Sequence, residues 1–293
     1  EWQSGLELLT QMLDYYAITH NDGFLCSTLL PIAEAVITFY DQHYPRSSQG
    51  ELRIEPAQAL ETYWDSVNPM PEIAGLRFVL PKLLVLPADL ISHQLREQWT
   101  RLLLEVPELP TRQIDDQVVL SPASEIGPKN NQENPELYAI FPYRLFGVSK
   151  SNIELARQAF THREHRGSHG WYQDDTQAAF LGETDQAYNY IVNRFRQNHP
   201  QSRFPAFWGP NFDWLPDQTH GGNGMMALQT MLMQTEDQKI ILFPAWPQNW
   251  NVAFKLHAPL NTTIEGVYNN RKLEHLSVTP EARFKDLAQM APE

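Results

Sequence analysis

Carboxylates stand beside aromatic side chains in one Pro-containing stretch, residues 53–65 (RIEPAQALETYWD), which holds Glu55, Gln58, Glu61 and Trp64. A sugar ring stacks its apolar faces on Trp or Tyr and bonds its hydroxyls to carboxylates and amides. Hydrolysis of a glycosidic bond needs a carboxylic acid to protonate the leaving oxygen, and a Glu beside aromatic surface can have the raised pKa that this role requires. The stretch therefore predicts a carbohydrate site. The alternative is a solvated loop with one helix cap.

Two more stretches join polar and aromatic residues. Asn134 and Glu136 lead into an aromatic run and predict one wall of a pocket, although a turn before a packed helix is an equally good reading. Trp171 and Asp174 lie in residues 170–177 (GWYQDDTQ). Asp174 can face a sugar, or it can simply cap a helix and interact with the helix dipole.

The most unusual stretch is residues 207–224 (FWGPNFDWLPDQTHGGNG). Glycines at a helix start let a backbone or a ligand approach closely, and a carboxylate held there can act as a base toward water. A structural loop is the alternative, but the two Trp with an Asp and a His favour a site. The candidates are Trp208, Asn211, Trp214, Asp217, His220 and Asn223.

Helices and long loops must position these residues. Apolar residues recur every three or four positions over 6–16 and 25–39, with a kink expected at Pro31. Further helices are predicted over 72–86, 89–105, 152–162, 173–182, 184–198 and 222–235. The clusters fall mainly in irregular segments at 44–71, 107–136 and 199–221, and loops of that length are often functional.

The pattern changes after residue 238. A short apolar run at 239–243 is followed by alternation over 262–268, a turn at Asn269-Asn270 and a strand over 273–278, which predicts a β-hairpin. The fold expected is mainly α, with a partial (α/α)6-type toroid over residues 1–237 and a small C-terminal β-sandwich region over 238–293.

Composition excludes several classes of protein. The formal net charge of −13 argues against nucleic acid and anionic membrane as partners, because both need a positive field. No apolar run reaches the roughly 18 residues of a membrane span. A single cysteine, Cys26, excludes an intramolecular disulfide framework. Without HExxH, Walker A, GxGxxG or GxSxG motifs, we expect neither metal nor cofactor.

The order of the clusters resembles glycoside hydrolase family 95, the α-L-fucosidase and α-L-galactosidase family, and its uncharacterised relatives. Residues 56–62 (PAQALET) are similar to the family's P-S-x-S-P-E-N loop, with Leu60 for Pro and Thr62 for Asn. Three later segments are similar to Q-I-D-G-N-F-G, M-L-L-Q and L-L-P-A-L-P: residues 218–224, 231–234 and 242–247.

The resemblance implies an (α/α)6 barrel followed by a β domain, and inverting hydrolysis of a terminal α-linked, fucose- or galactose-like sugar. It assigns the general acid to Glu61. The family's catalytic Asp aligns with His220, and Asp217 is the preferred base if the loop shifts. The family's N-x-N motif is not found before Glu61, so we expect it upstream of Glu1, in the remainder of a longer chain. A secreted or periplasmic location is also implied.

Two other functions remain open at this point. One is a catalytically silent carbohydrate-binding protein that retains the stacking Trp residues. The other is a polysaccharide lyase on a similar toroid, with Tyr63, His220 and Arg144 as candidate residues.

Overall fold

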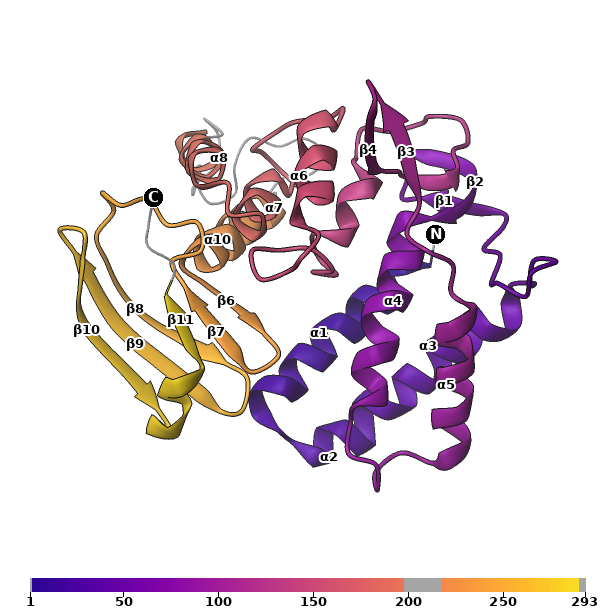
Figure 1. The fold of residues 1–293 in the computed structure, drawn as a ribbon, viewed down its shortest axis with the longest axis horizontal. Coiled ribbons are helices and arrows are strands. Elements are labelled where there is room, and N and C mark those ends of the chain that lie inside the picture. The colour runs from indigo at the N-terminus through magenta and orange to yellow at the C-terminus, as the bar shows by residue number, and fades with distance from the viewer. Residues whose placement is uncertain (1, 198–217, 290–293) are drawn as a thin grey trace. The chain divides into compact units, whose positions relative to one another are not determined.

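The computed structural model describes residues 2–197 and 218–289 (Figure 1). The chain forms two compact units. Unit 1 comprises Glu1–Leu145 and Glu154–His165, and unit 2 comprises Phe146–Ile153 and Arg166–Glu293.

Unit 1 begins with a group of helices: α1 (Gln3–Thr19), α2 (Asp22–Phe24), α3 (Leu30–His43), α4 (Met70–Leu84) and α5 (His93–Glu105). The predicted apolar face of the helix at 6–16 is confirmed, because Leu6, Leu9 and Leu13 are buried and α1 packs on α4. A π-helical turn, Leu25–Leu29, precedes α3. It lies where Pro31 has no N–H to donate to the carbonyl four residues back.

By length and composition alone, the helical segment Asp22–His43 is apolar enough to cross a membrane, a test that core helices of soluble proteins also pass.

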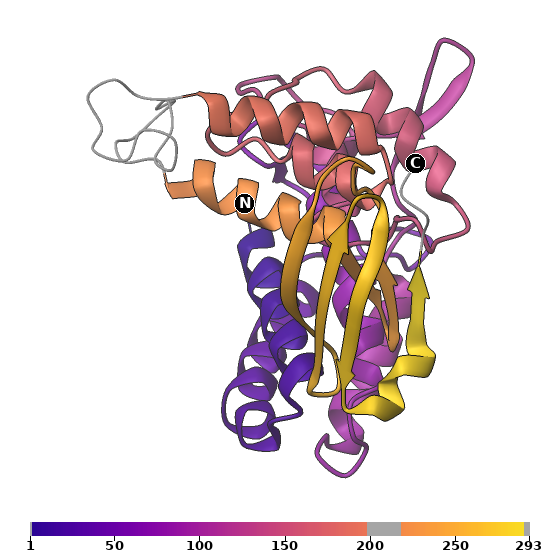
Figure 2. The same cartoon turned by 90° about the vertical axis from the view of Figure 1, so that its left-hand side faces the viewer.

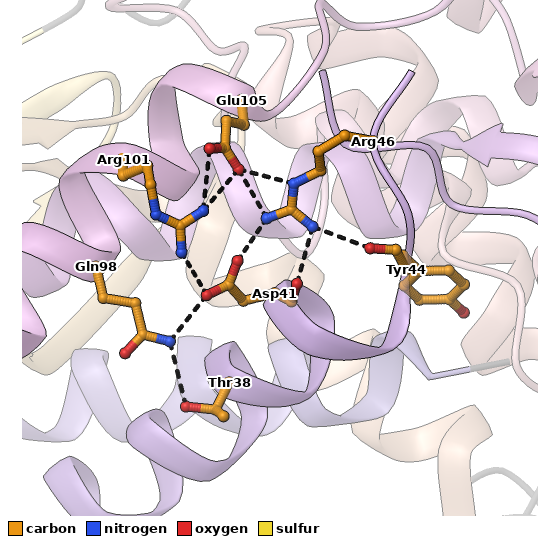
Figure 3. Close-up of polar contacts among 7 residues, drawn as sticks. All are labelled: Thr38, Asp41, Tyr44, Arg46, Gln98, Arg101 and Glu105. Atoms are coloured by element: carbon orange, nitrogen blue, oxygen red, sulfur yellow. Dashed lines mark hydrogen bonds and ion pairs between the residues drawn. The ribbon is translucent and has the colours of Figure 1, made fainter. Parts of the chain in front are cut away.

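Charged side chains tie α3 to α5 (Figure 3). Asp41 of α3 accepts hydrogen bonds from Arg101 at 2.6 Å and Gln98 at 3.1 Å, both on α5. Arg46 bonds to Asp41 and, at 2.8 Å, to Glu105. Burial raises the pKa of Asp41, but the bonds from Arg101, Gln98 and Arg46 outweigh it and hold that pKa below its ordinary value.

The remainder of unit 1 consists of short strands, one 3-10 turn and one helix. Strands β1 (Ala57–Ala59), β2 (Tyr63–Pro69) and β5 (Ala123–Glu125) form an antiparallel sheet. Strands β3 (Thr111–Ile114) and β4 (Gln117–Leu120) form a separate hairpin. The turn η2 and the helix α6 follow, at Pro135–Ala139 and Ile153–His162.

In unit 2, three helices surround a buried polar network: α7 (Asp174–Phe180), α8 (Thr184–Arg196) and α10 (Gln218–Leu232). Both α8 and α10 pack on α7. Gly224 permits the close approach of α10 to α8, since a Cβ there would lie 2.6 Å from the Phe195 ring.

Two three-stranded sheets complete the described part of unit 2, in colours from orange to yellow in Figure 2. One contains β6 (Met233–Glu236), β7 (Lys239–Leu242) and β11 (Leu287–Gln289), and the other is the antiparallel meander β8 (Val252–Ala258), β9 (Thr262–Asn269) and β10 (Lys272–Thr279). A short 3-10 turn, η3 (Glu281–Asp286), precedes β11. The predicted hairpin is confirmed, with its turn one residue later than expected. Asn270 and Arg271 both have positive φ, as a tight two-residue turn requires.

The predicted fold class is wrong. The described residues are 46% helical with 21% strand in four small, separate sheets, and a mainly α toroid followed by a β-sandwich is not shown among them. Two of these sheets lie in the first 125 residues, where Pro- and Asn-rich sequence suggested only loops. The division of the chain at residue 237 into two domains remains a prediction.

Candidate functional site

Two loop segments of unit 1 hold Glu61 in place. The carboxylate of Glu133 accepts a bond from the Glu61 N–H at 3.2 Å and another from the Thr62 hydroxyl at 3.1 Å. The Asn130 N–H donates to the Thr62 carbonyl at 2.7 Å, and the Trp64 N–H donates to the Pro128 carbonyl at 3.0 Å. Residues 61–64 and 128–133, far apart in sequence, therefore run side by side.

The Glu61 carboxyl is solvent-exposed, and its Oε2 accepts a hydrogen bond from Asn131 Nδ2 at 3.0 Å. Trp64 lies three residues on, and 45% of it is exposed. An exposed carboxyl oriented by an amide, on a segment with an exposed indole, suits the binding of a sugar hydroxyl.

Gly127 permits the close pairing of these loops. A Cβ on Gly127 would lie 1.6 Å from the Trp64 carbonyl oxygen, so a side chain there is incompatible with this backbone arrangement. The Gly127 N–H also donates to the Ser66 hydroxyl at 3.1 Å.

The other predicted residues of the first cluster lie at the edge of this region. Glu55 is exposed and forms an ion pair with Arg53 at 2.5 Å, whereas Gln58 is half-buried in β1. Both lie in unit 1 with Glu61, and their roles in sugar binding stay predictions.

Glu136 is only 4% exposed and lies at the start of η2. Burial raises the pKa of its carboxyl to about 7, a shift that a hydrogen bond from its own backbone N–H and the nearby charge of Arg112 only partly oppose. Burial also raises the pKa of Tyr63, and the charge of Glu136 adds to that increase. Glu136 thus titrates near neutrality beside a phenol and a guanidinium.

Asn134 fixes the segment that follows α6. Its Nδ2 donates to the His165 carbonyl at 2.7 Å, and its Oδ1 accepts from the His165 N–H at 3.0 Å. Next to this pair, Lys129 and Glu164 form an ion pair at 2.5 Å. Asn134, predicted as a sugar ligand, therefore uses its amide to hold the chain.

In unit 2, Arg194 and Asp175 form a fully buried ion pair, with 2.6 Å between Nε and Oδ2. The same guanidinium donates to the carbonyls of Tyr172 at 2.5 Å, Gly170 at 3.0 Å and His220 at 3.2 Å. One arginine thus joins α8, the start of α7 and the start of α10.

His220 belongs to this network, and both of its ring nitrogens are engaged. Nδ1 accepts a bond from the Gly170 N–H at 3.1 Å, so Nε2 carries the proton that is donated to the Arg194 carbonyl at 2.8 Å. With 0% exposure, the imidazole has no lone pair available for water. This geometry gives His220 a structural role, and the catalytic role expected from its sequence position stays a prediction that the geometry does not support.

The remaining predicted residues divide into two groups. Trp171 is half-buried and stacks on Tyr172 with centroids 4.4 Å apart, Asp174 is buried, and Asn223 donates to the Tyr172 carbonyl at 3.1 Å. These three lie in unit 2 with His220. The others, Trp208, Asn211, Trp214 and Asp217, lie outside the described residues.

Sequence reasoning missed four residues of unit 1 that bond to the candidate residues or act on them through charge: Arg112, Asn131, Glu133 and His165. The polar run at 129–134 (KNNQEN) was a usable signal for Asn131 and Glu133, because it adjoins a predicted cluster. Arg112 and His165 carry no such signal. Within residues 2–197 and 218–289, no group of three or more His, Cys, Asp or Glu is arranged to hold a metal ion.

The sequence matches no protein-family model and no curated protein.

Proposed function

We propose that this chain hydrolyses a glycosidic bond, removing a terminal α-linked, fucose- or galactose-like sugar by inversion, with Glu61 as the general acid. The observation that carries the proposal is the exposed Glu61 carboxyl, oriented by Asn131 and three residues before the exposed Trp64. A carboxylic acid that can reach the leaving oxygen is the first requirement of this chemistry. The motif resemblance around residues 56–62 supports the same assignment.

The base in this proposal is Asp217, which lies outside the described residues. His220, the other sequence candidate, is unsuitable because both ring nitrogens bond to backbone groups. Inversion requires a water between the acid and the base, with the two carboxyl groups roughly 6.5–9.5 Å apart.

A catalytically silent carbohydrate-binding protein is the second candidate. It is favoured by one observation, the structural role of His220 at the position where the resemblance expects a catalytic Asp. The lyase alternative has less support. Arg144 pairs with Asp14 at 2.8 Å, and the raised pKa of Tyr63 makes its phenolate harder to form.

The test compares Glu61→Gln with wild type on substrates with good and poor leaving groups. A general acid contributes about 10²–10⁴-fold to the rate, and it matters most where the leaving oxygen must be protonated. We expect Glu61→Gln to lose activity on α-L-fucosyl and α-galactosyl disaccharides by that factor, and much less on the corresponding 4-nitrophenyl glycosides. Proton NMR of the first product formed would report inversion.

Glu97→Gln is the matched control, because Glu97 is exposed on α5 and pairs only with His93, at 3.4 Å, in the described structure. If folded Glu61→Gln cleaves disaccharides as fast as Glu97→Gln does, Glu61 is not the acid. If wild type binds these sugars and releases none, the silent binding protein replaces the hydrolase.

A further inference from the structure

Arg112 has one guanidinium nitrogen, Nε, that no acceptor among the described residues satisfies. It lies on β3, paired in register with Val119 of β4, and its side chain is half-buried. Its Nε is fully buried and has no hydrogen-bond partner in the described structure. Because an unpaired buried donor is costly, this nitrogen needs an acceptor that the described protein atoms do not supply.

His165 presents a second unsatisfied nitrogen in the same region of unit 1. Its backbone is fixed by Asn134 on both sides, yet its Nε2 is buried and unpartnered among the described residues. The end of α6 also reaches the β3–β4 hairpin, since His162 Nε2 lies 3.1 Å from Gln117 Oε1.

Charge interactions place Glu136 and Tyr63 in this neighbourhood. The charge of Arg112 acts on the carboxyls of Glu136 and Glu164 and on the Tyr63 phenol, yet Arg112 forms no ion pair with either carboxylate within the described residues. The charge of Glu164, in turn, acts on His165. These groups act on one another through charge, and within the described residues Arg112 Nε and His165 Nε2 keep no hydrogen-bond partner, so both nitrogens are available to a small polar molecule.

The chemistry of the four groups selects the ligand. Arg112 donates, His165 and Tyr63 can donate or accept, and Glu136 can do either because its proton leaves near neutral pH. A sugar hydroxyl both donates and accepts, so it satisfies such a mixed set. A ligand carboxylate would accept a hydrogen bond from Arg112, but it would be repelled by the carboxylates of Glu136 and Glu164, and it is therefore disfavoured.

We propose that Arg112, Glu136 and His165 form a hydroxyl-recognition subsite for a neutral sugar ring, beside the Glu61 loop. This inference rests on the proposed function for the kind of ligand. It adds the residues that select among sugars, Arg112 and His165 in particular. The subsite is tied to the acid through residues 128–134, which contact the Glu61 segment at one end and carry Asn134 at the other.

The experiment measures binding of methyl α-L-fucoside, its 2-, 3- and 4-deoxy analogues and methyl α-D-galactosiduronate to the full chain by saturation-transfer NMR and calorimetry. Variants are Arg112→Gln, His165→Gln and Glu136→Gln, with circular dichroism to check folding. Arg157→Gln is the control, because Arg157 is a partly exposed arginine of α6 in the same unit.

We expect one deoxy analogue to bind wild type at least tenfold more weakly than the parent glycoside. Arg112→Gln should bind the parent glycoside and that analogue equally, because the variant lacks the guanidinium that would bond the missing hydroxyl. Arg157→Gln should discriminate between the two sugars as wild type does. If folded Arg112→Gln discriminates between the parent glycoside and the deoxy analogue as wild type does, the proposed subsite is wrong. If wild type prefers methyl α-D-galactosiduronate and Arg112→Gln loses that preference, the region is an anion site and not a hydroxyl-recognition subsite.

The outcomes separate this inference from the proposed function. If Glu61→Gln abolishes disaccharide hydrolysis while Arg112→Gln changes no affinity, the subsite is wrong and the hydrolase stands. If Glu61→Gln retains full activity while Arg112→Gln loses hydroxyl discrimination, the acid assignment is wrong and the subsite stands.

Discussion

Asp175 and Arg194 form an ion pair in which neither side chain is exposed to solvent, with 2.6 Å between Oδ2 and Nε. Burial raises the pKa of Asp175, and the charge and hydrogen bonds of Arg194 act in the opposite direction. Because the guanidinium also bonds three backbone carbonyls, the pair organises the junction of α7, α8 and α10. Its removal should disrupt the packing of all three helices.

We expect Asp175→Asn to lower the free energy of unfolding by about 3–5 kcal/mol, because it leaves a buried arginine uncompensated. Urea unfolding followed by circular dichroism measures this loss. Asp185→Asn, an exposed position on α8, should change stability by less than about 1 kcal/mol. Equal stability of the two variants would mean that the ion pair contributes little to this unit.

The structural role of His220 leads to a second prediction. Nitrogen-15 NMR should show the Nε2–H tautomer, because Nδ1 accepts from Gly170. His220→Ala leaves the Gly170 N–H and the Arg194 carbonyl without this partner and should cost roughly 2–6 kcal/mol, at about 1–3 kcal/mol for each of the two buried groups. The exposed His275→Ala in β10 serves as control. If His220→Ala keeps the full stability of wild type and loses only catalytic activity, His220 has a catalytic role.

Gly127→Ala tests how the acid is positioned. Its Cβ would overlap the Trp64 carbonyl, so the two loops must separate, at a cost of at least about 1–3 kcal/mol. Disaccharide hydrolysis should fall as the Glu61 segment moves. Gly222→Ala is the matched control, because its Cβ meets no atom within 4 Å on α10 and should stabilise the helix by about 0.5–1 kcal/mol. Full activity and stability of Gly127→Ala would show that the loop pairing is unnecessary.

Glu136 makes stability depend on pH. Its folded pKa of about 7 lies above its ordinary value of 4.5, so the folded state binds more protons between these values. Stability therefore falls as pH rises from 4.5 to about 7, by up to roughly 3 kcal/mol, and is then level. Glu136→Gln should remove this pH dependence. The measurement is the difference in the free energy of unfolding between wild type and the variant, obtained by urea unfolding at several pH values. A difference that is constant from pH 4.5 to 8 would contradict the raised pKa.

Asp41 should make stability depend on pH with the sign opposite to that of Glu136. Because its folded pKa is lowered from 3.8, its contribution is complete above that pH and is lost as pH falls through the folded value. Asp41→Asn should cost about 1–3 kcal/mol at pH 7, since it weakens charge-assisted bonds to two arginines. The cost should shrink in acid below pH 3.8. Glu97→Gln, on the same pair of helices, should show neither effect.

Local sequence determined some of the regular elements, although not the strands within residues 57–69 and 111–125. Leu6, Leu9 and Leu13 recur at helical spacing and are buried in α1, while the alternation over residues 262–268 gave β9 and its hairpin. These patterns depend only on which face of a helix or strand is apolar, and that is written in neighbouring residues. The side-by-side pairing of residues 61–64 with 128–133 depends on hydrogen bonds across some 70 positions, which no local pattern encodes.

The roles of individual polar residues were likewise decided by tertiary structure. Sequence placed His220 among candidate catalysts because of its type and its glycine-rich surroundings. The fold buries it between Gly170 and Arg194, where both nitrogens bond to backbone. Arg112 and His165 are unremarkable in sequence, and they become candidates only because folding buries one nitrogen of each without a partner among the described residues. Burial and the choice of partner depend on three-dimensional proximity, which residue type and spacing do not specify.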